Sequence, residues 1–318
     1  MNTFIAASYS GIEDVVGKDI KDILNVKARK ADNGRVVFSC ENLGNFLDKA
    51  KSVSYVYRLL GKFKFRSLED LQNKAAKLDY SFIKGNFVVR CKRHGDHDFN
   101  SIDAEQAIGE AIHNKGYNVD MKSKNIILAD IVGNNCFIGL LLKDNMQKRY
   151  YRVRINKQGL NACMAYSLLK IAGWENQDSL LDPNCRDGII LIEAGLDGGE
   201  KLYGLENNKS NYKSAEINAK LAKIKLILYD YNVSQIDEVF KSVDFIISFL
   251  PCESKNVSNN FINRYYNDFF TKARKIAKKK ILVLVSDDSL MKDYLNEFTI
   301  VEKREITAGN RYILYLLK

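Results

Sequence analysis

Residues 180–194 read LLDPNCRDGIILIEA, and this stretch decides the fold of the C-terminal half. An apolar strand ends at Asp182, a tight turn runs to Gly188, and an apolar helix follows. A strand, a glycine-containing turn and a helix in this order are typical of a crevice that binds a nucleotide-like ligand. Two positions of the turn where small residues are expected hold Arg186 and Asp187 instead.

The sequence from residue 161 onward alternates apolar strands with amphipathic helices. Strands are predicted at 179–182, 201–206, 224–229, 243–248 and 280–286. Regular alternation of this kind favours a largely parallel sheet with helices on both faces. Two last strands, 298–305 and 311–317, are separated by a short loop and are expected to form an antiparallel hairpin at the sheet edge.

Three consecutive strands of this half are each followed by an acid. These acids are Asp182, Glu206 and Asp230, and each follows the previous one by 24 residues, about one strand-helix unit. Carboxyl ends of parallel strands meet at one edge of a sheet, so the three acids are expected along one crevice. Acids there can accept hydrogen bonds from a ribose diol or an adenine amine. Capping of a neighbouring helix is the plainer explanation for any one of them.

Residues 1–160 read as two smaller α+β units followed by a basic connector. In the first unit a helix from about Ile12 follows the strand 3–7. In the second, Ser67 is expected to cap a helix, and the strand 86–91 comes later. The predicted domains are 1–64, 65–145, a basic linker over 146–160, and 161–318.

Positive charge is concentrated in the front part of the chain. Residues 1–160 hold 27 Lys and Arg against 18 Asp and Glu, a net charge of +9, whereas residues 161–318 hold 22 against 21. A basic front half beside a balanced rear half favours binding of a polyanion by the front half. A lysine-rich, solvated surface explains the excess equally well.

The rear half resembles the THUMP-domain RNA family of class I S-adenosylmethionine-dependent methyltransferases. Residues 181–194 are similar to the first motif of that family, D-P-x-C-G-S-G-T-x-x-I-E-A. Residues 203–206, followed by 218–222, resemble its second motif, in which the acid binds ribose. The resemblance implies the cofactor S-adenosyl-L-methionine and four residues that hold it: Asp182, Gly188, Glu206 and Asp230.

The front half resembles the same family. Residues 90–101, 108–111 and 119–121 look like a THUMP domain, and residues 11–16 are similar to the ferredoxin-like unit that precedes it in the family. The implied fold class is α/β, with a Rossmann-like class I methyltransferase domain preceded by a ferredoxin-like α+β unit and a THUMP domain. The implied activity is methylation of the N2 amine of a guanosine in tRNA, most similar to the branch that acts at position 6.

By the same resemblance, the front domains and the connector bind tRNA. The expected phosphate contacts are basic side chains: Lys92, Arg93, Lys148, Arg149, Arg152 and Arg154. For each of these residues taken alone, an ordinary solvated surface side chain is the simpler interpretation.

The segment after the fourth strand of the rear half departs from the family pattern, N-P-P-Y or N-L-P-Y. In the family, the asparagine side chain and the next carbonyl orient the target amine, and the aromatic residue stacks on the base. This chain has Phe249, Leu250, Pro251 and Cys252 there, so the carbonyl of Leu250 remains but the amide and the aromatic ring do not. Strand alternation is expected to turn Ser248 away from this site.

The cofactor turn departs in the same direction, which leaves three readings open. Arg186 and Asp187 add bulk and a carboxylate where backbone contacts the ligand, although Arg186 could instead pair with the methionine carboxylate of the cofactor. The chain is then either an altered tRNA guanine-N2-methyltransferase or a catalytically inactive tRNA-binding paralogue, to which a protein partner would belong. A protein for a different adenosine ligand is a third, weaker reading.

Other features point to a cytoplasmic protein without a metal. The six cysteines are far apart and form no C-x-x-C pair, which fits reduced thiols better than disulfides or zinc. His94 and His97 lack a third ligand nearby. No apolar run is long enough for a membrane span, and residues 1–10 carry no secretory signal.

Overall fold

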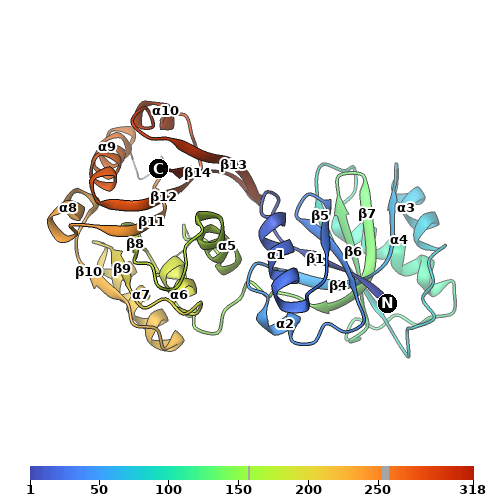
Figure 1. The fold of residues 1–318 in the computed structure, drawn as a ribbon. Coiled ribbons are helices and arrows are strands. Elements are labelled where there is room, and N and C mark those ends of the chain that lie inside the picture. The colour runs from blue at the N-terminus through green and yellow to red at the C-terminus, as the bar shows by residue number, and fades with distance from the viewer. Residues whose placement is uncertain (157, 253–257) are drawn as a thin grey trace. The chain divides into compact units, whose positions relative to one another are not determined.

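The computed structural model describes residues 1–156, 158–252 and 258–318, and these form two compact units. Unit one comprises Met1–Ser8 and Val16–Met146, and unit two comprises Tyr9–Val15 and Gln147–Lys318 (Figure 1). Unit two therefore contains the basic connector and one short segment from near the N-terminus. Within the described residues, no helix is both long enough and apolar enough to span a bilayer.

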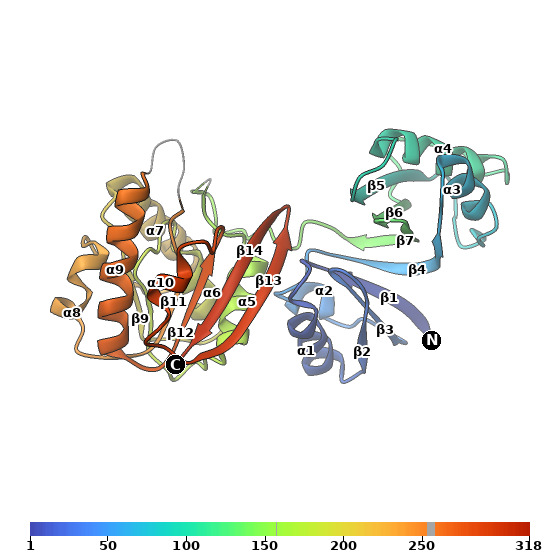
Figure 2. The same ribbon diagram turned by 90° about the horizontal axis from the view of Figure 1, so that it is seen from above.

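Unit one is built on a single sheet. Its described strands number seven and follow the order β2-β3-β1-β4-β7-β6-β5, with only β5 and β6 paired in parallel. Helices α1 and α2 lie beside β1 to β3, and α3 and α4 lie beside β5 (Figure 2). The elements, in chain order, are β1 (Asn2–Ala7), α1 (Glu13–Leu24), β2 (Ala28–Asp32), β3 (Arg35–Cys40), α2 (Phe46–Lys49), β4 (Tyr55–Lys64), α3 (Leu68–Ala75), β5 (Val88–His94), α4 (Ser101–His113), β6 (Ile126–Val132) and β7 (Asn135–Lys143).

A buried ion pair connects the two halves of this sheet. Arg35 on β3 donates to both carboxylate oxygens of Asp130 on β6, over 2.6 and 2.5 Å, and both side chains are buried. The hydroxyls of Tyr55 and Tyr57 on β4 donate to the same carboxylate over 3.1 and 3.0 Å. The carboxylate thus has four donors from two strands, which offsets the cost of burying its charge.

Strands β2 and β4 were not expected from the sequence, and β4 bears on the division of the front half into two domains. It spans the end of the predicted first domain and pairs with β1 on one side and β7 on the other. The first two predicted domains therefore share one sheet. Their boundary between residues 64 and 65, like the rest of the four-part division, stays a prediction.

Unit two has the predicted sheet. Its described strands follow the order β10-β9-β8-β11-β12-β14-β13, with the first five parallel and the last pair an antiparallel hairpin at the edge. The parallel sheet and the edge hairpin are confirmed. The strands are β8 (Leu180–Asp182), β9 (Leu202–Leu205), β10 (Ile227–Tyr229), β11 (Val243–Phe249), β12 (Ala277–Val285), β13 (Ile300–Ala308) and β14 (Asn310–Leu317).

Helices cover both faces of the second sheet, as the alternating pattern predicts. One apolar cluster joins the sheet to α5, α6 and α7, and another joins the opposite face to α8, α9 and α10. Gly173 ends α5 in a left-handed conformation, φ +73°, as a C-terminal glycine cap does. The helices are α5 (Ala162–Ala172), α6 (Ile189–Gly195), α7 (Lys209–Ala222), η1 (Val233–Gln235), α8 (Ile236–Val239), α9 (Asn259–Ile276) and α10 (Met291–Tyr294).

Candidate active site

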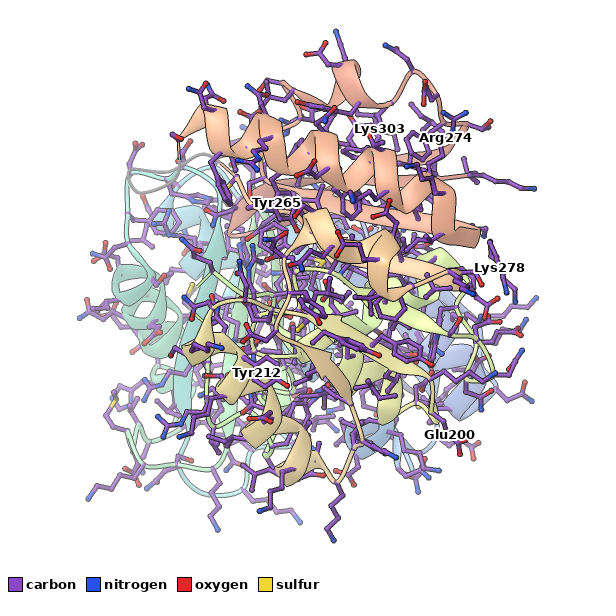
Figure 3. All side chains as sticks on the ribbon, turned by 90° about the vertical axis from the view of Figure 1, so that its left-hand side faces the viewer. Glu200, Tyr212, Tyr265, Arg274, Lys278 and Lys303 are labelled. Atoms are coloured by element: carbon purple, nitrogen blue, oxygen red, sulfur yellow. The ribbon has the colours of Figure 1, made fainter. Side chains whose placement is uncertain are left out.

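A cavity of about 320 Å³ lies at the carboxyl ends of β8, β9, β10 and β11, closed on one side by α9. This edge of a parallel sheet is where open α/β folds bind their ligands. The volume is at the lower end of the range for small-molecule sites. Tyr265, on the first half of α9, lies beside these strand ends (Figure 3). The cavity is lined by Pro183, Asn184, Leu205, Glu206, Asn207, Tyr231, Asn232, Val233, Ser234, Pro251, Phe261, Arg264, Tyr265 and Asp268.

Asp182 ends β8 beneath this cavity and is buried. Its Oδ1 accepts hydrogen bonds from the hydroxyl of Ser248, over 2.7 Å, and from the backbone N–H of Asn184, over 3.1 Å. Burial raises the pKa of Asp182 to about 6, although these two hydrogen bonds and the charge of Arg186 oppose the shift. Ser248 does point away from Phe249, as strand alternation predicts, and the structure shows that it thereby holds the cofactor-turn acid.

Glu206 follows β9 and reaches the cavity. Its carboxylate accepts hydrogen bonds from the backbone N–H of Arg186, over 3.1 Å, and of Asn208, over 2.8 Å. Burial raises the pKa of Glu206, and these bonds to the charged form oppose that shift. The carboxylate thus ties the turn after β8 to the turn after β9.

Asp230, the third acid of the series, is placed differently. It follows β10 but does not line the cavity, and its half-exposed carboxylate pairs with the exposed ammonium group of Lys209. The next two residues, Tyr231 and Asn232, line the cavity in its place. The 24-residue spacing predicts the strand ends, but it does not fix which way the third side chain turns.

The turn after β8 keeps the backbone geometry of a glycine turn without its first glycine. Arg186 has φ +50°, in the left-handed region that favours glycine, and Gly188 has φ +80°. A Cβ on Gly188 would come within 3.2 Å of the Cβ of Ala215 on α7. Gly188 therefore lets α7 pack closely on the turn, whatever its contact with a ligand.

Asp187 turns away from the expected ligand position and pairs with the connector. Its Oδ2 accepts hydrogen bonds from Nε and Nη2 of Arg152, over 3.0 and 2.7 Å, and from the backbone N–H of Asn156, over 3.1 Å. The Asp187 side chain is fully buried and that of Arg152 is 10% exposed. The negative charge that the sequence places in the cofactor turn is therefore neutralised from the connector.

The guanidinium group of Arg186 lies 4.5 Å from the centre of the Phe249 ring. Burial lowers the pKa of Arg186, and the nearby carboxylates of Asp182 and Glu206 oppose that shift. Within the described part of the chain, this guanidinium donates no hydrogen bond to a carboxylate. The turn thus presents a cation that stacks on an aromatic ring.

The four positions expected to receive the base lie directly after and at the end of β11. Phe249 is buried, with Tyr312 against its ring edge, and its carbonyl accepts a hydrogen bond from Nδ2 of Asn184 over 2.8 Å. Leu250 is buried and its N–H donates to the carbonyl of Leu284. Pro251 lines the cavity, and Cys252 is half-buried beside it.

The predicted phosphate contacts divide into two groups. Arg149 donates to Glu193 over 2.8 Å and Arg152 pairs with Asp187, so both hold the connector onto the rest of unit two through fully buried carboxylates. This internal pairing argues against phosphate contact by either of them. Lys92 pairs with Asp144 over 3.0 Å at the surface of unit one. Nη1 of Arg93 donates to the carbonyl of Gly95 and lies 2.9 Å from Nδ1 of His97. Lys148 and Arg154 are exposed.

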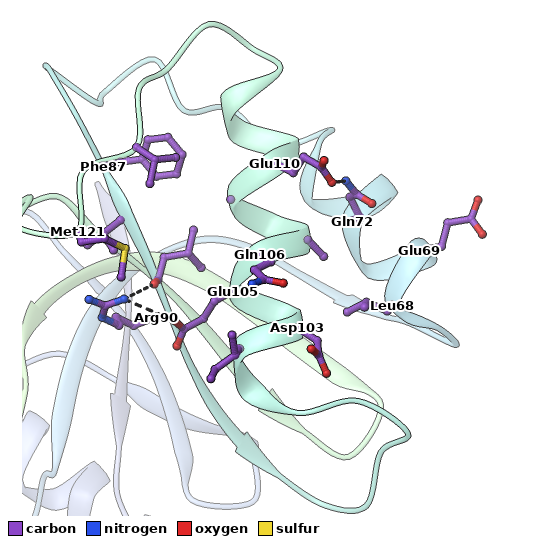
Figure 4. A pocket seen from close by; sticks show the side chains of 16 residues that line it. Leu68, Glu69, Gln72, Phe87, Arg90, Asp103, Glu105, Gln106, Glu110 and Met121 are labelled. Carbon is purple, nitrogen blue, oxygen red and sulfur yellow. Dashed lines mark hydrogen bonds and ion pairs between the residues drawn. The ribbon is translucent and has the colours of Figure 1, made fainter.

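A second cavity, of about 820 Å³, lies in unit one between α3, α4 and β5 (Figure 4). Four carboxylates line it, those of Glu69, Asp103, Glu105 and Glu110, against the single guanidinium of Arg90, which pairs with Glu105 over 3.5 Å. This excess of negative charge repels phosphate.

Sequence reasoning missed two residues of the site, Asn184 and Tyr265. The hydroxyl of Tyr265 is buried and, within the described residues, has no hydrogen-bond partner, a feature that often marks a ligand position. Phe261 and Tyr265 stand four residues apart on α9, so an aromatic pair at helical spacing was a usable signal. For Asn184 no pattern in the sequence gave a signal.

The sheet order and the acids at its carboxyl edge define a class I methyltransferase fold. The family model described as UPF0020, RMKL-like, methyltransferase domain, matches residues 149–314, and the chain belongs to this family. The chain is 27% identical to a tRNA (guanine(6)-N2)-methyltransferase of Archaeoglobus fulgidus, over 86% of this chain and 79% of the relative. It is 24% identical to the enzyme of the same name from Methanocaldococcus jannaschii, over 94% and 95%. The crystal structure of TrmN from Thermus thermophilus superposes with a TM-score of 0.80 at 22% identity, over 100% of this chain and 99% of that one.

These comparisons confirm the resemblance and the fold class predicted from the sequence. The superposition on TrmN extends over both units, so it includes the front half as well as the methyltransferase domain. The chain is thus a methyltransferase-family protein, and the reading as an enzyme is supported in preference to the inactive one.

Proposed function

We propose that the protein transfers a methyl group from S-adenosyl-L-methionine to the N2 amine of guanosine 6 in tRNA. The observation that carries this proposal is the open cavity at the strand ends, lined by Glu206 and with Asp182 buried beneath it, in a chain whose relatives from Archaeoglobus fulgidus and Methanocaldococcus jannaschii bear that activity in their names. Despite its altered turn, the chain keeps this cavity open.

The residues around the cavity fit an adenosine cofactor. Glu206 presents a carboxylate for a ribose diol, and the hydroxyl of Tyr265, which has no hydrogen-bond partner among the described residues, offers another polar group in the lining. When bound, S-adenosyl-L-methionine supplies an electrophilic methyl group. Asp182 and Glu206 are held in place beforehand by backbone N–H donors, so their carboxylates need not reorganise on binding.

Arg186 has a part in this proposal that suits its lack of a carboxylate partner among the residues that the structure describes. Its guanidinium is fixed over Phe249 at the edge of the cofactor turn, where it can pair with the carboxylate of the cofactor's methionine part. The added bulk in the turn is thereby a contact with the ligand, and the neutralised Asp187 does not oppose it.

The tRNA is expected to contact basic side chains that are not held by fully buried carboxylates. Lys148 and Arg154 on the connector and Lys92 and Arg93 on β5 are the candidates that remain. Arg149 and Arg152 hold the connector and are left out of this set. Each phosphate contact contributes to affinity without sequence preference, and its contribution falls as salt is raised.

Calorimetry with the purified full-length protein tests the cofactor. We expect saturable binding of S-adenosyl-L-methionine and weaker binding of its decarboxylated form, which lacks the group that Arg186 would receive. The variant R186M should bind both forms with similar affinity. No binding of S-adenosyl-L-methionine at millimolar concentration would overturn the proposal.

Radiolabelled methyl transfer tests the substrate. Unmodified tRNA transcripts should accept one methyl group, and transcripts with inosine at position 6, which lacks the N2 amine, should accept none. Cofactor binding without transfer to any tRNA would favour the inactive paralogue instead. A methyl group mapped to another guanosine would keep the reaction but correct the position.

A further inference from the structure

We infer that Asn184 supplies the amide oxygen that orients the target amine, a task for which Phe249 has no suitable group. This inference rests on the proposed function and deepens it. Asn184 lies in the turn after β8 and lines the cavity together with Pro251 from the segment after β11. It thus stands where cofactor and base would meet.

The orientation of the Asn184 amide is fixed by its surroundings. Nδ2 donates to the backbone carbonyl of Phe249 over 2.8 Å, and a flipped amide would instead put two oxygens face to face. The backbone N–H of the same residue donates to Oδ1 of Asp182 over 3.1 Å. Side chain and backbone are thereby anchored to the ends of two neighbouring strands, β8 and β11.

The oxygen on the other branch of this amide is available to a ligand. Oδ1 of Asn184 accepts no hydrogen bond from the residues that the structure describes, and it is not among their buried unpaired atoms. Because the residue lines the cavity, its oxygen is open to the cavity's contents. The family pattern assigns the second acceptor to the carbonyl of Leu250, the residue after the one that Asn184 holds.

An acceptor at this place has a definite chemical use. The lone pair of the guanine N2 amine is delocalised into the ring, so the nitrogen is a poor nucleophile while it stays planar. Hydrogen bonds from its two N–H groups to acceptors on one side draw these hydrogens out of the ring plane and direct the lone pair to the other side. A neutral amide takes no proton, so the extra proton of the methylated nitrogen passes to water.

The ring of Phe249 has no acceptor, and its face is covered by Arg186. An amide at position 249 would reach the amine from β11, whereas the amide of Asn184 reaches the same region from β8 and is braced against the Phe249 backbone. The acceptor has therefore moved to the neighbouring strand end.

Equilibrium binding tests this inference without turnover. Fluorescence anisotropy in saturating S-adenosylhomocysteine would compare tRNA with guanosine or inosine at position 6. We expect the wild type to prefer guanosine by roughly 10-fold, the value of one good hydrogen bond to an otherwise unpaired group. N184A should lose most of that preference, whereas N176A, an exposed asparagine before β8, should keep it. Equal binding of the two tRNAs by the wild type would by itself overturn the inference.

Steady-state kinetics supply the second readout. We expect N184A to lower kcat by about 10²-fold, with the affinity for S-adenosylhomocysteine within about 3-fold of wild type, because the lost bond acts on the amine. The double variant N184A/F249N, which returns an amide to β11, should recover part of kcat. Unchanged kcat in N184A would refute the inference while leaving the proposed function intact, whereas a wild type without transfer would refute the proposed function.

Discussion

The turn after β8 and the segment after β11 border the same cavity, and both carry residues that do not suit a methyltransferase at first reading. In the turn, each unusual side chain has a partner: Asp187 is neutralised by Arg152, and Arg186 stacks on Phe249. Phe249, the last residue of β11 before that segment, is buried, and its carbonyl holds Asn184.

The two regions differ in the kind of change for which the neighbouring residues compensate. The turn conserves a backbone shape and balances a buried charge, which are matters of stability. The segment after β11 lacks a chemical group, and a group of that kind is found on the neighbouring strand end, which is a matter of reactivity. Substitutions in the first region should therefore be read by unfolding and cofactor binding, and substitutions in the second by the reaction.

The largest effect is expected where the turn's charge balance is broken. R152A leaves the fully buried Asp187 carboxylate without its cation, so we expect the free energy of unfolding to fall by about 3–5 kcal/mol. Urea titration measures this. R152A/D187S, which removes the buried charge as well, should recover most of the loss. Equal stability of the two variants would mean that the pair does not hold the turn.

A smaller effect is expected from the acid that joins the two turns. E206Q keeps the size of the side chain but removes the charge that accepts from two backbone N–H groups. A hydrogen bond to a charged group contributes roughly 1–3 kcal/mol, so cofactor affinity should fall by about 10²-fold. Calorimetry measures this. E200Q, at an exposed acid in the loop before β9 (Figure 3), is the matched control and should bind as the wild type does.

The pH dependence of cofactor binding should report Asp182. Its pKa of about 6 lies above the usual value of 3.8 for an aspartate, so the ionised form, which we propose the cofactor requires, is lost as pH falls through 6. Affinity should then fall by about 10-fold per pH unit below 6. For the same reason this group destabilises the ligand-free fold as pH rises from about 4 through 6.

Calorimetric titrations between pH 5 and 8, in buffers of different ionisation heat, measure both the affinity and the proton released on binding. The variant D182N should bind weakly at every pH, with a flatter profile that retains only the titration of Glu206, whose pKa burial also raises. A pH profile in D182N as steep as that of the wild type would assign the titration to another group.

The smallest effect is expected at Arg186. R186G relieves a left-handed backbone conformation, at a gain of about 1 kcal/mol, and loses the stacking on Phe249, at a similar cost. The free energy of unfolding should therefore change by less than about 1 kcal/mol, as measured by urea titration. A loss of more than 2 kcal/mol would show that the arginine stabilises the turn itself.

Much of the fold could be predicted from the sequence, because local patterns of residues determine the strands and helices. Alternation of strands and helices predicted the parallel sheet, and Gly188 marked the end of the turn before α6. Strand β4 was missed because YVYRLLGKFK does not alternate: Tyr55, Val56 and Tyr57 are all buried, since both faces of the strand are covered there.

The site was harder to predict from the sequence than the fold, because its decisive contacts join residues that lie far apart in the chain. Asn184 and Phe249 are 65 positions apart, and Arg152 and Asp187 are 35 apart. A spacing rule could place Asp182 and Glu206 at strand ends, but the direction of the Asp230 side chain depends on Lys209, which lies on a helix. Taken one by one, Arg186 and Asp187 suggest a damaged turn. Together with their partners Phe249 and Arg152, they form a consistent set of contacts.

The buried pair of Arg35 and Asp130 has a practical consequence for anyone who exchanges parts between such proteins. A chimera joined at residue 64 would take the arginine from one parent and the carboxylate from the other, along with opposite halves of one sheet. A graft that keeps this pair intact should exchange residues 1–8 and 16–146 together, because residues 9–15 belong to unit two.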